Sequence, residues 1–167
     1  MASLSMVPDR GACLALLQEQ HTPAHIQRHC IAVAEEGLRL GRRLNDAGQA
    51  LDLALIEAGG LLHDILRLEP DHAAAGAALL LRLGYPRLAE VVAVHMDLHG
   101  VLPPAVDEAL IVFLADKQVR EDYRVTVEQR YGVAIERFPD HRAEIEVGMN
   151  RAIAARRMVE AIIGPVD

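Results

Sequence analysis

The chain has 167 residues, a length typical of one domain with its own buried core. Hydrophobic residues make up 51% and aromatic residues only 3%, without any Trp, which favours packed helices and argues against a Trp-anchored β-sandwich or a disordered chain. The net charge of −7, from 17 Lys and Arg against 24 Asp and Glu, excludes general nucleic-acid binding and leaves only a local basic patch open.

Short segments rich in Gly, Pro and Asp separate stretches of helical periodicity along the whole chain. The expected N-caps are Asp9, Asp52, Asp71 and Thr22, the last followed by Pro23 in the first turn. No segment alternates with a period of two for more than a few residues. We therefore expect one all-α domain over residues 1–167, with seven or eight helices: a short one after Asp9, then about 23–44, 53–69, 72–83, 86–98 and 106–119, and two more within 125–163.

Two cysteines, Cys13 and Cys30, are too few for a disulfide framework and suit a reducing compartment, so we expect a cytoplasmic protein. No apolar run approaches the roughly 18–20 residues that span a membrane. The opening residues 1–10 lack the basic and apolar regions of a signal peptide, and we expect none.

Four histidines and two aspartates lie in otherwise apolar parts of separate predicted helices. A buried carboxylate needs a partner, and so do the ring nitrogens of buried imidazoles. Taken singly, each could be an ordinary core residue; taken together, they favour a divalent metal site with mixed nitrogen and oxygen ligands, which suits Fe, Mn, Co, Ni or Zn. The six candidate metal ligands are His29, His63, Asp64, His72, His95 and Asp116.

Six ligands exceed what one catalytic ion usually takes from a protein, so we expect two ions that share Asp64 as a bridge. One ion takes His29, His63 and Asp116, and the other takes His72 and His95. Such pairs typically lie ~3.5–4 Å apart and stabilise both oxygens of a phosphoryl displacement.

The order of these residues resembles the HD-domain superfamily of metal-dependent phosphohydrolases, whose pattern of a His, a His-Asp pair and a later Asp matches His29, His63-Asp64 and Asp116. A usually dinuclear branch has two further histidines, which match His72 and His95. The resemblance covers about residues 26–120. Segments such as 84–86, 95–98 and 115–117 are similar to HD modules that accompany molybdenum-cofactor-type nucleotidyltransferases. Segments 58–66, 71–77 and 113–117 are similar to small bacterial HD proteins, some of which cleave dinucleoside tetraphosphates symmetrically.

This resemblance implies a metal-site core at about 22–120, followed by C-terminal helices at 125–163. It also implies hydrolysis of a phosphate ester or anhydride of a small nucleotide-type substrate by metal-activated water, with His63 and Asp64 as the catalytic pair. The cofactors expected are two divalent transition-metal ions, with Mg as an alternative in one site. Partners expected are the substrate alone, with neither membrane nor nucleic acid, and a homodimer is left open.

A chain with a net charge of −7 repels anions, so a phosphate substrate needs local cations. The candidates nearest in sequence are Arg67, one turn after Asp64, and Lys117 and Arg120, beside Asp116. Arginine suits phosphate better than lysine does, because its planar guanidinium can donate two parallel hydrogen bonds. His99 is either a proton donor near the leaving group or a plain loop residue.

Two other functions use the same residues. The superfamily also includes mixed-valent di-iron oxygenases with a similar set of six ligands. Alternatively, the chain is a regulatory module that senses a metal or nucleotide beside a partner protein, with residues 143–163 either docking that partner or covering the core.

Overall fold

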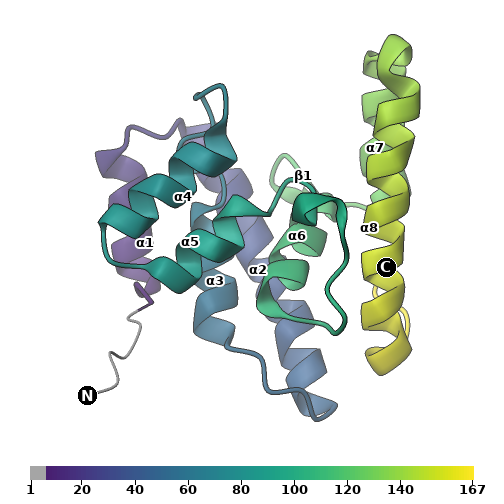
Figure 1. Ribbon diagram of the computed structural model, residues 1–167, viewed down its shortest axis with the longest axis horizontal. Coiled ribbons are helices and arrows are strands. Elements are labelled where there is room, and N and C mark those ends of the chain that lie inside the picture. Colours follow the sequence, from purple (N-terminus) through teal and green to yellow (C-terminus); the bar gives the residue numbers. More distant parts are fainter. Residues whose placement is uncertain (1–6) are drawn as a thin grey trace.

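The computed structural model describes residues 7–167; residues 1–6, on which part of the signal-peptide expectation rests, lie outside the described residues. The described chain folds into helices joined by short turns, with a single two-stranded hairpin, so the all-α prediction is confirmed (Figure 1). The helices are α1 (Arg10–Glu19), α2 (Ala24–Asp46), α3 (Leu53–Leu62), α4 (His72–Arg82), α5 (Pro86–Ala93), α6 (Glu108–Lys117), α7 (Val127–Arg137) and α8 (Arg142–Ile163), with 3-10 turns at Leu98–Gly100 and Pro139–His141. None of the helices in residues 7–167 is both long and apolar enough to cross a lipid bilayer.

The helix starts follow the expected caps in part. Asp9 and Asp52 accept backbone N–H bonds at the starts of α1 and α3, which satisfies donors that helix starts leave unpaired. Asp71 lies at the N-cap of α4, but its side chain makes no capping hydrogen bond. Thr22 was wrongly expected to cap α2: the N-cap is Pro23, and the Thr22 hydroxyl instead donates to the carbonyl of Ile65 at 2.8 Å.

Two helices end earlier than their periodicity predicts. The α3 helix ends at Leu62 instead of near residue 69, and α5 ends at Ala93 instead of near 98. In each case the next histidine directs its Nδ1 to the carbonyl three residues before it, His63 to Gly60 and His95 to Val92, both at 2.7 Å. In a continuing α-helix, each of these carbonyls would accept the backbone N–H four residues later. Here the imidazole Nδ1 lies at hydrogen-bond distance instead, and the chain turns.

The predicted sixth helix is also shorter, because Val119 leaves it for a strand. β1 (Val119–Arg120) pairs antiparallel with β2 (Tyr123–Arg124), and Arg120 lies opposite Tyr123. Glu121 begins the connecting loop with a positive φ of 55°, a conformation that is uncommon outside glycine. This hairpin packs against α2 and α6.

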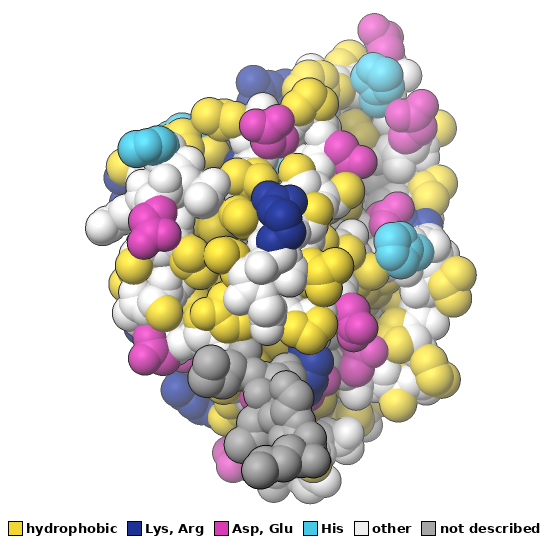
Figure 2. Space-filling view, turned by 60° about the vertical axis from the view of Figure 1, so that its left-hand side comes forward, with side chains coloured by type: hydrophobic (Ala, Val, Ile, Leu, Met, Phe, Trp, Pro, Cys, Tyr) yellow, Lys and Arg dark blue, Asp and Glu magenta, His cyan; other side chains and the backbone are white. Residues whose placement is uncertain are grey.

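The helices enclose two large buried apolar clusters, one mainly among α1, α3, α4 and α5 and one mainly among α2, α6 and α8, and a small third one of Val33, Ala115 and Val119. The α8 helix buries Ala152, Ala155 and Val159 in the second cluster, so it covers the core. On the side of α1, α4 and α5, hydrophobic side chains surround isolated charges on the surface (Figure 2).

Helices α2 and α3 cross closely, because Gly60 has no side chain. A Cβ at Gly60 would lie 2.5 Å from the Cα of Ala34, a separation that real Cβ atoms essentially never show. The close crossing brings the end of α3 against the middle of α2. The α2 helix carries His29, the first of the candidate ligands.

Candidate metal centre

The six side chains expected as metal ligands lie together in one largely buried cluster. His29 comes from α2, His72 from the first residue of α4, and Asp116 from α6. His63 and Asp64 lie in the turn after α3, and His95 lies in the turn after α5. Helix ends from distant parts of the sequence thus meet at one point.

Asp64 lies at the centre of this cluster. Its Oδ2 is 3.5 Å from Nε2 of His63, and its Oδ1 is 3.2 Å from Nε2 of His72 and 3.4 Å from Nε2 of His95. Asp116 lies on the other side, with Oδ1 3.0 Å from Nε2 of His29 and 3.6 Å from Nε2 of His63.

The donor atoms form two groups that share one residue. The ligand atoms of His29, His63 and Asp64 lie within 4.8 Å of one another, and so do those of Asp64, His72 and His95. The two oxygens of the Asp64 carboxylate face different histidines. This is the arrangement that a carboxylate bridge between two cations requires.

Backbone carbonyls fix the orientation of three of the imidazoles. Nδ1 of His29 lies 2.7 Å from the carbonyl oxygen of Glu121, as Nδ1 of His63 and His95 do from theirs. A carbonyl oxygen only accepts, so each Nδ1 carries the proton and each neutral ring presents an Nε2 lone pair to the cluster. Histidine ligands of metals are typically held in this way.

The histidine Nε2 atoms lack the partners that burial demands. Nε2 of His63, His72 and His95 is buried, and none has a hydrogen-bond partner within the described residues. Unsatisfied buried polar atoms are costly and call for an explanation. A divalent cation would satisfy all three, and the mixed imidazole and carboxylate donors suit a transition metal. The residues present therefore fit a metal.

Electrostatics keep the two carboxylates ionised. Burial raises the pKa of Asp64, but His63, His72 and His95 outweigh it, and the net pKa lies below the ordinary value. Burial likewise raises the pKa of Asp116, yet Lys117 and the neighbouring imidazoles hold it well below the usual range. Both groups are thus anionic and ready to bind a cation.

The pKa values of His95 and His63 shift in opposite directions. Burial lowers the pKa of His95 overall, whereas the charges of Asp64 and Asp116 overcome burial at His63 and raise its pKa. Any proton on Nε2 of His63 must leave when that nitrogen binds a cation.

A cavity of about 740 Å³ opens directly beside the metal centre. His29 and Asp64 line it, and so does the predicted phosphate ligand Arg67, whose Nε lies 3.5 Å from Oδ2 of Asp64. The Arg67 side chain is 51% exposed. A substrate that reaches the centre through this cavity would meet its guanidinium.

The other three predicted phosphate ligands do not line this cavity. Lys117 is buried, with Nζ 2.6 Å from Oδ2 of Asp116 and 3.3 Å from the carbonyl oxygen of His95, so its ammonium holds a candidate ligand. Arg120 lines a different cavity, beside Tyr123. His99 is exposed in the 3-10 turn and does not line the 740 Å³ cavity.

Four basic residues that were not predicted also line this cavity. Arg130 and Arg137 come from α7, and His25 and Arg28 come from the first turns of α2. The only sequence signal was the spacing of Arg130 and Arg137, seven residues apart and hence on one face of a helix. Nothing in the sequence indicated that α7 would fold back onto the metal centre.

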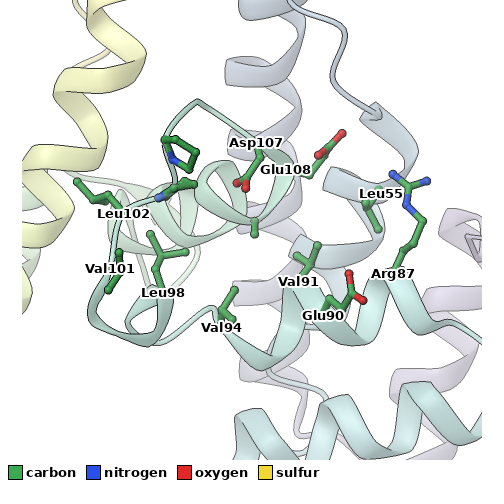
Figure 3. Close-up of a pocket in the computed structure, with 13 residues that line it drawn as sticks. Leu55, Arg87, Glu90, Val91, Val94, Leu98, Val101, Leu102, Asp107 and Glu108 are labelled. Carbon is green, nitrogen blue, oxygen red and sulfur yellow. The ribbon is translucent and has the colours of Figure 1, made fainter.

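A second cavity, of about 520 Å³, lies away from the metal centre between α3, α5 and the segment before α6 (Figure 3). Its walls are mostly apolar, and three of its charged residues act within the fold. Asp107 caps α6, Glu108 accepts from the backbone N–H of Asp52, and Arg87 pairs with the Asp52 carboxylate. None of the six candidate ligands lines this cavity.

Comparison with known proteins identifies the family of the chain. A family model described as the HD domain matches residues 26–120, more than half of the chain. An uncharacterized protein of Methanocaldococcus jannaschii is 36% identical over 64 residues, which are 36% of this chain and 38% of that protein. A tRNA (cytidine(56)-2'-O)-methyltransferase of Thermoplasma volcanium is 29% identical over 143 residues, which are 75% of this chain and 41% of that protein. The chain thus spans about two fifths of the length of these relatives. No solved structure matches it.

Proposed function

The chain belongs to the HD-domain superfamily of metal-dependent phosphohydrolases, and from this premise we propose that it uses two divalent metal ions to hydrolyse a phosphate ester or anhydride of a nucleotide. The observation that carries the proposal is the set of buried, unpartnered Nε2 atoms of His63, His72 and His95 around the ionised Asp64. The ligand atoms around Asp64 fall into two groups that share only this carboxylate, which favours two ions over one.

We assign the ligands to two sites that share Asp64. His29, His63 and Asp116 hold the first ion with one oxygen of Asp64, and His72 and His95 hold the second with the other. The two groups of ligand atoms that share Asp64 support this division. Fe, Mn, Ni, Co or Zn match the donors, with Mg as an alternative in one site.

Bound divalent ions supply Lewis-acid polarisation of a phosphoryl oxygen and make water acidic enough to attack phosphorus near neutral pH. The residues of the chain prepare the site for this chemistry. Asp64 and Asp116 contribute negative charge, and the carbonyl-bound imidazoles hold their Nε2 atoms in place. Lys117 orients Asp116 through its 2.6 Å contact. Arg67 binds an oxygen of the phosphate that enters the cavity.

The lining of the cavity supports a substrate with both a charged and an apolar part. Arg67 supplies a cation, and the side chain of Leu68 on the same wall is 75% exposed, so an apolar surface is accessible beside it. A nucleotide satisfies both, with its phosphate at the metal centre and its base against the apolar side chain.

The proposal is tested by a phosphate-release screen of the purified protein against nucleotides, dinucleoside polyphosphates and phosphomonoesters, each with Mn, Ni, Co, Fe or Mg. We expect release with at least one transition metal and no oxygen consumption. Asp64→Ala should abolish both activity and metal retention, whereas Asp140→Ala, an exposed carboxylate in the turn before α8, should change neither. Oxygen consumption with an iron-dependent visible absorption band would instead indicate a di-iron oxygenase. Metal binding without turnover of any compound would instead favour a sensing module.

A further inference from the structure

The cavity beside the metal centre carries more positive charge than its acids neutralise. Four of the residues that line it are arginines, and three acids line it with them. Asp64, one of these acids, is engaged by the metal centre. The four arginines are Arg28, Arg67, Arg130 and Arg137.

The ion pairs of these arginines are long. Nε of Arg28 lies 3.7 Å from Oδ2 of Asp122, and Nη2 of Arg130 lies 3.7 Å from Oδ1 of Asp116. Arg137 has no acidic partner within 4.0 Å among residues 7–167, and its guanidinium lies against the ring of Phe138. These cations retain donors for an anion that enters from solvent.

Arg130 gives the clearest sign of a ligand. Its Nε is buried and has no hydrogen-bond partner in the described part of the chain. An unpaired buried donor is costly, and more so in a charged group. Because Nη2 of Arg130 adjoins Asp116, the guanidinium stands at the edge of the metal centre. An oxyanion bound there would take up the free donor.

Arg137 extends this basic surface away from the metals. It lies seven residues after Arg130 on α7, which is about 10 Å along the helix on the same face. Both side chains line the same cavity, and Arg28 of α2 lines it with them. The cavity thus has arginine side chains at two positions, Arg130 beside the metal centre and Arg137 farther along α7.

We propose that α7 forms a second phosphate subsite, so that the preferred substrate carries two adjacent phosphate groups. The terminal phosphate lies at the metal centre against Arg130, and the inner phosphate lies against Arg137 and Arg28. This inference rests on the proposed hydrolase function and names its substrate class. The α7 helix follows residue 120, where the family match ends, so the subsite belongs to the C-terminal part of this chain.

The corresponding reaction is hydrolysis of a phosphoanhydride. The oxygen of water forms a bond to the terminal phosphorus, and the bond from that phosphorus to the bridging oxygen breaks. Its electron pair stays on the bridging oxygen, which leaves as part of the inner phosphate, and the protons of the water pass to the released phosphates and to solvent. Arg137 and Arg28 offset the negative charge that develops on the leaving phosphate.

Two measurements test the subsite. The first is calorimetric binding of inorganic pyrophosphate and inorganic phosphate to the metal-free protein. The second compares KM for a nucleoside diphosphate and a nucleoside monophosphate with the Mn²⁺-loaded protein. We expect Arg137→Ala to weaken pyrophosphate binding and to raise KM for the diphosphate at least about tenfold, the factor that corresponds to about 1.4 kcal/mol. Phosphate binding and KM for the monophosphate should stay within about twofold.

The control is Arg157→Ala, which removes another exposed arginine, on α8, that lines none of the cavities described above, and it should leave all four values unchanged. Arg137→Lys should recover part of the affinity, and Arg137→Glu should lose more than the alanine variant. Equal effects of Arg137→Ala on monophosphate and diphosphate, or none on either, would overturn the subsite while the hydrolase function stands. Failure of every phosphate compound to turn over, with Arg137-dependent pyrophosphate binding intact, would overturn the hydrolase function and retain the anion site.

Discussion

Nδ1 of His29 donates to the carbonyl oxygen of Glu121 across 2.7 Å, although the two residues are 92 positions apart in the chain. The contact ties α2 to the loop between β1 and β2, and Nε2 of the same ring lies 3.0 Å from Asp116. The small hairpin therefore orients one candidate ligand through its backbone.

This contact predicts that the loop conformation controls one metal ion. Glu121 has a φ of 55°, which proline cannot adopt because its ring fixes φ near −65°. Glu121→Pro should displace the carbonyl and weaken the His29 site about 10–100-fold, the usual effect of losing a partner that orients a ligand. Metal titration with a competing chelator measures this. Glu121→Gly keeps the carbonyl and suits a positive φ, so its affinity should match the wild type. Equal loss in both variants would show that the Glu121 side chain, and not the carbonyl, is responsible.

Removal of His72 should cost chiefly one of the two ions. His72→Ala deletes a ligand of the second group while it leaves His29, His63 and Asp116 in place. We expect the metal content to fall from about two equivalents to about one, as measured by elemental analysis after loading. His141→Ala removes an exposed histidine near the start of α8 and serves as the control. An unchanged stoichiometry in His72→Ala would remove that residue from the ligand set.

The metal-free protein should lose stability in acid. The pKa values of Asp64 and Asp116 lie below the ordinary value in the folded state, so both groups stabilise the fold above about pH 4. That contribution is lost as the pH falls below this value, with a slope that approaches about 1.4 kcal/mol per pH unit for each group. The raised pKa of His63 contributes stability at low pH, and this contribution is lost only as the pH rises above about 6.5.

Urea unfolding of chelator-treated protein between pH 2.5 and 6 measures this dependence. Asp64→Asn should have a shallower decline than the wild type, because one titrating group is gone. A free energy of unfolding that stays level down to pH 2.5 would contradict the depressed carboxyl pKa values.

The crossing of α2 and α3 should be intolerant of a methyl group. Gly60→Ala places a Cβ 2.5 Å from the backbone of Ala34, so the helices must separate, and overpacking of this kind typically costs about 1–3 kcal/mol. Gly132→Ala, also within a helix but with nothing within 4 Å of the new Cβ, should instead stabilise by about 0.5–1 kcal/mol. Thermal unfolding of both variants gives the comparison. Equal stability of the two would mean that the crossing can relax.

Much of the fold and the grouping of the site residues could be predicted from the sequence, because apolar surroundings mark buried polar groups. His63 and His95 follow apolar runs, and the structure buries both fully or nearly so. The boundaries near them were wrong, since periodicity does not reveal that an imidazole will take a backbone carbonyl. Thr22 looked like a helix cap, but its partner Ile65 is 43 residues away and no local pattern encodes it.

The basic residues of the cavity were harder to find for a similar reason. Proximity in sequence favoured Lys117 and Arg120, yet the ammonium of Lys117 faces Asp116, and Arg120 lines another cavity. Arg130 lies 3.7 Å from Asp116, and α7 packs against α8, which in turn packs against α6 and α2. These contacts of α8 with earlier helices are not encoded by any local pattern.

The imidazole–carbonyl contacts of His63 and His95 have a consequence for how a metal would bind. The same bond that stops a helix also sets the tautomer of the ring, so the coordination sphere is assembled by folding itself. Uptake of ions then demands little reorganisation, and a stripped sample should reload quickly without refolding. The fixed positions of these imidazole nitrogens would then determine which cations the site prefers.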